Sequence, residues 1–250
     1  MPAGRNEQIV MLSGEPGATL AENVRLTLVD MIMKGAFDEG TRLYPERIAE
    51  QLGVSMTPVR EALMQLAADG FVDGIQRRGF HVRTPDARQV TNLWQVRQGL
   101  ELTAGELAVA RRRDGLISDA DIDYLSALQR SQESSEALAN HVQKLDLNGR
   151  LHGRIVELSG NDILVSVYQS IRTKVAGSLV QRGLDTWRDR LEAESNEHWG
   201  LINALRDADF AAFETATRRH LARSLKDALA DLAARPVDRD LTTKPKSVQA

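Results

Sequence analysis

The stretch "GVSMTPVREALMQLAADGF", residues 53–71, has the pattern of a single helix with sharply defined ends. Ser55 or Thr57 can cap its first turn, and Pro58 is tolerated there because first-turn amides have no acceptor inside the helix. Arg60 follows at once and projects from the same turn. So firm a start fits ordinary core packing, and it also fits a helix whose first turn recognises a ligand.

The flanking sequence places this helix in a larger motif. Residues 20–33 and the stretch "LYPERIAEQLG" (residues 43–53) each have helical periodicity, the second with Pro45 at a first helical position. The stretch "FVDGIQRRGFHVR" (residues 71–83) is typical of two short strands joined by a turn. Three helices followed by a β-hairpin predict a winged helix-turn-helix.

In a helix-turn-helix, the first turn of the second helix faces base edges in the major groove of DNA. Arg60 could therefore bind guanine or a phosphate, Arg47 could reach the DNA backbone, and Arg77 and Arg78 would lie at the tip of the wing. An arginine early in a helix is also common on any solvated surface. Because basic and acidic residues nearly balance in this segment, charge alone does not choose between the two.

The segment from Leu43 to Val82 resembles the N-terminal domain of GntR-family bacterial transcription regulators, whose pattern is close to L-x-E-R-x-L-A-x-x-L-G-V-S-R-x-P-V-R-E-A-L. Met56 stands where the family commonly has arginine, so we expect an operator preference that differs from the usual one. The resemblance and the helix geometry together give these candidate DNA-binding residues: Arg47, Ser55, Met56, Thr57, Pro58, Arg60, Arg77, Arg78 and Gly79.

The rest of the chain has a different organisation. Residues 1–19 are polar and suggest a flexible leader, residues 20–84 form the DNA-binding domain, and residues 236–250 lack periodicity and suggest a disordered tail. Residues 85–235 have the pattern of about six helices and no strand. The sequence therefore predicts a mostly α protein, with a winged helix-turn-helix and a C-terminal antiparallel helical bundle.

Composition excludes several classes of protein. The 250 residues are 42% hydrophobic and 27% charged, with a net charge of −3 and no cysteine. No apolar run approaches the roughly 18–20 residues of a membrane span, so no membrane partner is expected. The absence of cysteine fits a cytoplasmic protein and excludes disulfides and thiolate metal sites.

Three histidines fall on inward faces of different predicted helices. His152 follows Asn148 by one helical turn, His198 is in register with neighbouring leucines, and His220 lies on a face with Phe213. A single buried histidine is usually a hydrogen-bonded core residue. Three imidazoles with an amide oxygen suit Zn²⁺ or another first-row divalent ion, provided that the helices converge.

Two other candidate ligands fail on helical geometry. His141 is eleven residues before His152, about 16 Å along a helix, which is too far for one ion. Asp146 is two residues before Asn148 and therefore points away from it.

Residues 86–233 resemble the FCD domain of the FadR subfamily of GntR regulators. Many members hold a divalent metal at the floor of an effector pocket with an Asp-x-x-x-His pair and two further histidines. The resemblance implies Zn²⁺ or Ni²⁺ on Asn148, His152, His198 and His220. Asparagine in place of aspartate brings no charge, so we expect weaker metal affinity and a preference for a carboxylate effector.

Arg97 is a second candidate contact for that carboxylate, although a solvated or dimer-interface arginine fits the sequence equally well. We expect a homodimeric, ligand-responsive repressor that binds a palindromic double-stranded DNA operator, and no enzyme activity. Two alternatives remain open. One is a metalloenzyme fused to a DNA-binding module, although no catalytic carboxylate accompanies the histidines. The other is the same regulator with a metal-free effector pocket.

Overall fold

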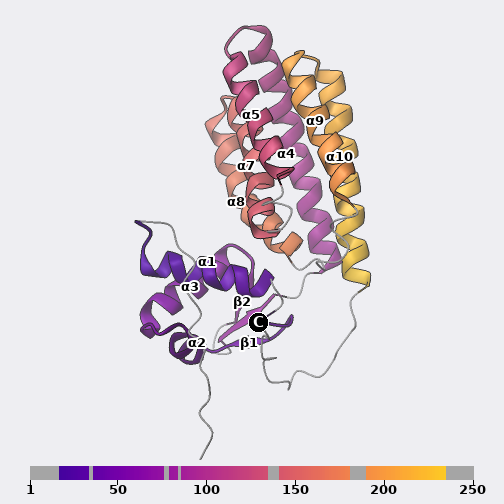
Figure 1. Cartoon of the computed structure of the whole chain (residues 1–250). Helices are drawn as coiled ribbons and strands as arrows, with labels where there is room; N and C mark the ends of the chain where they lie inside the picture. The colour runs from indigo at the N-terminus through magenta and orange to yellow at the C-terminus, as the bar shows by residue number, and fades with distance from the viewer. Residues whose placement is uncertain are drawn as a thin grey trace, which may run out of the picture. The chain divides into compact units, whose positions relative to one another are not determined.

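The computed structural model describes residues 17–33, 36–75, 79–83, 86–134, 141–180 and 190–234. The chain divides into two compact units between residues 84 and 85. Figure 1 shows a smaller unit that contains a sheet and a larger one built from helices. None of the helices in the described ranges is both long and apolar enough to cross a membrane.

The smaller unit has the predicted helices and hairpin, together with one strand that the sequence pattern did not reveal. Its elements are α1 (Leu20–Met33), β1 (Arg42–Leu43), α2 (Pro45–Leu52), α3 (Met56–Ala68), β2 (Val72–Ile75) and β3 (Gly79–Val82). The antiparallel sheet has the order β1-β3-β2, with Arg42 opposite His81 and Leu43 opposite Phe80. β1 was missed because two residues are too few to show strand periodicity.

The core of this unit fixes the orientation of α3. Val59, Leu63 and Leu66 on α3 are fully buried, as are Val24 and Leu28 of α1. α2 begins at a proline and ends at Gly53, whose φ of +66° is the left-handed conformation that glycine adopts without strain. A tight connection therefore holds α2 and α3 together while the opposite side of α3 stays exposed.

The larger unit is all-helical, as predicted. Its described helices are α4 (Ala87–Arg113), α5 (Asp119–Gln132), α7 (His141–Leu158), α8 (Asp162–Val180), α9 (Leu191–Arg206) and α10 (Phe210–Ala233). Side-chain caps begin three of these helices, at Asp86, Asp209 and Ser118, and Ser118 forms a complete capping box with Asp121. A short connection that contains Gly160 and Asn161 separates α7 from α8.

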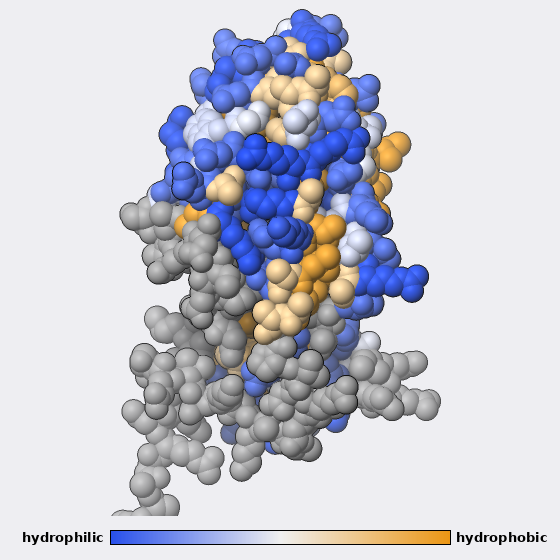
Figure 2. All heavy atoms as spheres, turned by 90° about the vertical axis from the view of Figure 1, so that its right-hand side faces the viewer, coloured by the Kyte–Doolittle hydropathy of each residue, from blue (hydrophilic) through white to orange (hydrophobic). Residues whose placement is uncertain are grey.

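Contacts at the end of α4 give the relative directions of its neighbours. Arg112 donates to the carbonyl of Arg206 at the end of α9, and Arg113 donates to the carbonyl of Ala208, just before α10 begins. α9 therefore runs parallel to α4, whereas α10 runs antiparallel to it. The side of the unit where α9 and α10 lie in Figure 1 is mostly hydrophilic, with hydrophobic side chains exposed in several places (Figure 2).

The core of the bundle changes character along its length. A large apolar cluster, including Ala108, Leu151 and Leu205, fills the part near the C-terminal end of α4. Further toward the N-terminal end of α4, the interior contains buried polar side chains, among them Arg97 and Glu101. Burying charged groups costs free energy unless they are paired, so buried charges commonly mark a functional site. This part of the bundle is therefore a candidate site.

Candidate functional site

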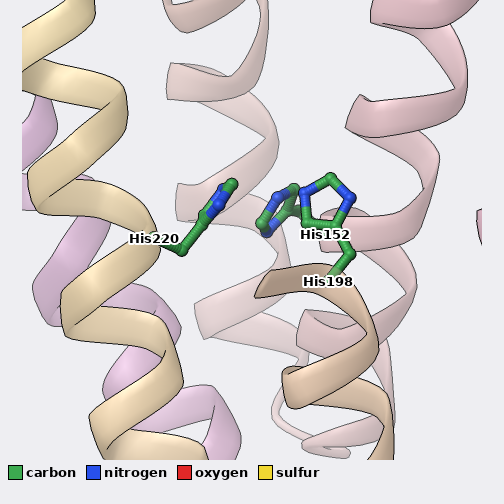
Figure 3. A group of neighbouring side chains, drawn as sticks. All are labelled: His152, His198 and His220. Atoms are coloured by element: carbon green, nitrogen blue, oxygen red, sulfur yellow. The ribbon is translucent and has the colours of Figure 1, made fainter. Parts of the chain in front are cut away.

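The three histidines singled out in the sequence converge in the interior of the bundle. His152 comes from α7, His198 from α9 and His220 from α10, and they point toward one another (Figure 3). Their ring centroids are 4.8–5.2 Å apart, and one nitrogen from each lies within 4.8 Å of the others. All three side chains are buried. Helices distant in sequence thus bring three imidazoles to one point.

Each imidazole is oriented by a hydrogen bond at Nδ1. The partners are Glu101 Oε2 at 3.1 Å for His152, Gln129 Oε1 at 2.9 Å for His198 and Glu197 Oε2 at 3.0 Å for His220. Because these oxygens accept, each Nδ1 carries the proton, which leaves Nε2 with a lone pair. Metal-binding histidines are held in this tautomer by such oxygens.

Sequence reasoning did not find these three acceptors, because Glu101 and Gln129 lie on helices other than those of their histidines and far away in sequence. Glu197 is next to His198 but bonds to His220. The sequence offered one local indication: Glu101 follows Arg97 by one helical turn, a spacing at which the two side chains can pair.

Two imidazole nitrogens of the cluster, Nε2 of His152 and Nε2 of His198, are buried and have no hydrogen-bond partner in the described structure. The same is true of Oδ1 of Asn148, one turn before His152 on α7, and of Oε1 of Gln132, whose amide donates to Gln129. Buried polar atoms are nearly always paired in proteins, so a group of unpaired acceptors indicates that a cation or a donor belongs there. The residues present therefore fit a divalent metal.

The protonation states also suit a metal. Burial lowers the pKa of His152 to about 4. The negative charge of Glu101 acts to raise this pKa, and the positive charge of Arg97 offsets part of that effect. Burial likewise holds the pKa of His198 well below its usual value, with contributions from His220, His152 and Lys144. Both rings are neutral near pH 7, and neutral imidazole is the form that binds metal.

Glu101 is the centre of a buried network. It accepts hydrogen bonds from Arg97 Nε at 2.6 Å and from the hydroxyl of Tyr168 at 3.0 Å, in addition to its contact with His152. Burial alone would raise the pKa of Glu101, but Arg97 and His152 hold it well below its usual range. The Glu101 carboxylate is therefore ionised, and the positive charge of Arg97 balances its negative charge.

Arg97 does not lie on a solvated face, because its side chain is only 3% exposed. This excludes the solvated alternative that the sequence left open. Arg97 donates a hydrogen bond to Glu101, which in turn contacts His152, so Arg97 lies next to the histidine cluster. Its contact with an effector stays a prediction.

Helix geometry excluded Asp146 and His141 as metal ligands, and the position of Asp146 in the structure agrees with this. The carboxylate of Asp146 is 59% exposed and pairs with Arg150 and Arg172 on the surface. The side chain of His141 lies outside the described residues. Asn148 precedes His152 by one turn with its oxygen buried, and its role as a ligand stays a prediction.

The second candidate site is the exposed first turn of α3. Ser55, Met56, Thr57 and Arg60 are exposed, whereas Pro58 is buried and so fixes the turn instead of offering a surface to DNA. The predicted cap needs correction: Ser55 occupies the N-cap position, but its side chain makes no capping hydrogen bond, and Thr57 lies inside the helix. The first-turn amides are therefore left without a side-chain acceptor from Ser55.

The remaining DNA-binding candidates surround this turn. Arg60 lies 3.7 Å from Glu46, and both side chains are about 60% exposed, so the pair holds Arg60 only weakly. Arg47 is exposed at the start of α2. Gly79 begins β3 with a φ of +84°. Arg77 and Arg78 lie outside the described residues.

Comparison with known proteins identifies both units. Residues 20–82 match the family described as bacterial regulatory proteins, gntR family, and residues 92–223 match the FCD domain. The chain is 33% identical over 182 residues to the Nta operon transcriptional regulator of Aminobacter aminovorans, covering 72% of this chain and 82% of that protein. It is 30% identical over 148 residues to the HTH-type transcriptional regulator YdhC of Bacillus subtilis, covering 58% of this chain and 62% of that protein.

A solved structure supports the fold. The E. coli McbR/YncC structure superposes with a TM-score of 0.67 at 22% identity, covering 85% of this chain and 98% of that one. The matched families and relatives are transcriptional regulators and not enzymes, which removes the metalloenzyme alternative. The chain is thus a member of the GntR family of bacterial DNA-binding transcription regulators, in the subfamily whose second domain is an FCD domain.

Proposed function

We propose that this regulator is a cytoplasmic, homodimeric repressor whose hold on a palindromic operator is changed by a small carboxylate effector. The main support for the effector site is that three buried imidazoles meet at one point and that each is oriented by a hydrogen bond at Nδ1. His152, His198 and His220 would hold a divalent metal such as Zn²⁺ or Ni²⁺, with Asn148 as a further oxygen ligand. A bound metal would supply a Lewis-acidic centre that takes a carboxylate oxygen of the effector.

The protein residues explain why an anion suits this site. The imidazoles of His152 and His198 are neutral near pH 7, and the Asn148 amide brings no charge. The two buried carboxylates that contact the histidines are each paired with an arginine, Glu101 with Arg97 and Glu197 with Arg223. A divalent cation would therefore keep most of its charge toward the effector, which favours a carboxylate over a neutral molecule.

The DNA-binding arm rests on the exposed first turn of α3. Arg60 and the exposed residues before it would enter the major groove, with two copies reading the two half-sites of a palindrome. Effector binding must then differ in strength between DNA-competent and DNA-incompetent states of the dimer, because a ligand shifts an equilibrium only through such a difference.

Arg60→Ala tests the DNA-binding arm. We expect operator affinity to fall by about 1–3 kcal/mol, the usual contribution of one bidentate arginine contact to a base. Fluorescence anisotropy with labelled duplexes from the region upstream of the regulator's own gene measures it. The matched control is Arg218→Ala, which removes an exposed arginine from α10. Equal affinities for the two variants would contradict the assignment of Arg60.

His198→Ala tests the metal site. Untagged wild-type protein should contain close to one equivalent of Zn²⁺ or Ni²⁺ per chain, and the variant should contain almost none, because one of three imidazole ligands is lost. Elemental analysis gives the stoichiometry. The control is His81→Ala, which removes a histidine from the wing. If wild type holds no more metal than His198→Ala, the effector pocket is metal-free.

A further inference from the structure

Three exposed side chains meet where β1 passes into α2. The guanidinium of Arg42 and that of Arg47 each lie over the ring of Tyr44, 4.9 Å from its centroid. Tyr44 itself is 39% exposed, although a large aromatic side chain is normally buried or paired. One tyrosine thus contacts two arginines that come from different elements.

The two arginines lie on different elements of the unit. Arg47 belongs to the first turn of α2, the helix that precedes α3. Arg42 lies beside the start of the wing, where a Cβ added to Gly79 would be 3.6 Å from Arg42 Nε. The Tyr44 ring therefore joins the predicted backbone contact on α2 to a cation next to the wing.

The charge of the two guanidinium groups distinguishes them from Arg60. In the described part of the chain, no carboxylate forms an ion pair with Arg42 or Arg47, whereas Arg60 has Glu46 close to it. Stacking on an aromatic ring restricts an arginine but leaves its N–H donors available around the edge of the guanidinium plane. Such an arginine loses less side-chain freedom when it binds a phosphate.

We propose that Arg42 is an additional contact to the DNA phosphate backbone and that Tyr44 is a positioning residue that holds Arg42 and Arg47 ready for it. The proposal rests on the DNA-binding function proposed above.

A phosphate contact has a signature that a structural role does not share. Each neutralised phosphate releases counterions, so Arg42→Ala should reduce the slope of log affinity against log salt concentration by about one. The loss in affinity should be similar on the upstream duplex and on a random-sequence duplex of equal length, because phosphates carry no base identity. Arg218→Ala on α10 should leave both quantities unchanged.

Tyr44 is tested by a conservative pair of variants in the full-length protein. Tyr44→Phe keeps the ring and should bind DNA like wild type, whereas Tyr44→Leu should weaken binding several-fold. That weakening should largely disappear in a background that carries Arg42→Ala and Arg47→Ala, because Tyr44 acts through these two side chains. Circular dichroism melting curves check that the variants are folded.

The outcomes separate this inference from the proposed function. If wild type binds the upstream duplex and Arg42→Ala leaves the salt slope unchanged, the phosphate contact is wrong. If Tyr44→Phe binds as weakly as Tyr44→Leu, the ring is not what positions the arginines. If wild-type protein binds neither duplex, the proposed DNA-binding function itself fails.

Discussion

Glu101→Gln is expected to lower the free energy of unfolding of the full-length protein by about 3–5 kcal/mol, the cost of leaving a buried charge without its partner. Arg97 is fully buried against Glu101, and no other carboxylate in the described structure pairs with it. The glutamine amide can still accept a hydrogen bond but cannot neutralise the guanidinium. Urea denaturation followed by circular dichroism measures the change.

The same variant should weaken metal binding. Glu101 holds the proton of His152 on Nδ1, and loss of such an orienting carboxylate commonly costs about 10–100-fold in metal affinity. Competition for Ni²⁺ against a chromophoric chelator would measure the affinity. Glu106→Gln on the same helix is the control, because Glu106 is exposed and outside the network.

A double variant separates the two effects. Arg97→Met with Glu101→Leu replaces the buried ion pair by apolar side chains and should recover most of the stability, since such replacements are often neutral. It should not recover metal affinity, because His152 still lacks its acceptor. If Glu101→Gln unfolds at the same urea concentration as Glu106→Gln, the network contributes nothing to stability.

The helical periodicity of the sequence was enough to predict the winged helix-turn-helix and the all-helical second unit. It also placed His152, His198 and His220 on inward faces, because a helix repeats every 3.6 residues whatever surrounds it. Whether the three faces meet depends on how α7, α9 and α10 pack. No single helix contains that information, so only the structure could show that the histidines converge.

The features that sequence reasoning missed have two physical causes. Gln129 reaches His198 from another helix, and tertiary packing creates that contact. Arg42, Tyr44 and Arg47 are close in sequence, but they lie where a strand passes into a helix, so no single periodicity relates their side chains. The error at Ser55 has a different origin: the residue type and position suit a cap, but whether a hydroxyl bonds an amide depends on its rotamer.

Gly105→Ala is expected to destabilise the protein by about 2 kcal/mol or more, although alanine normally favours a helix over glycine by about 1 kcal/mol. A Cβ at Gly105 would lie 1.9 Å from Cε1 and 2.3 Å from Cδ1 of Phe213. Phe213 is 1% exposed and packed within the apolar cluster, so its ring has no free space to enter. The added methyl group must therefore push α10 away from α4.

The displacement should also reach the histidine cluster, because His220 lies two turns after Phe213 on α10. We expect Gly105→Ala to weaken Ni²⁺ binding and to lower the urea midpoint together. Gly99→Ala on the same helix is the matched control: a Cβ there meets nothing within 4 Å, so the change should stabilise by up to about 1 kcal/mol. Phe213→Leu should relieve much of the Gly105→Ala defect, because the smaller side chain vacates the space that the new methyl group needs. If Gly105→Ala is as stable as Gly99→Ala, then α4 and α10 are not packed as closely at this point as the structure shows.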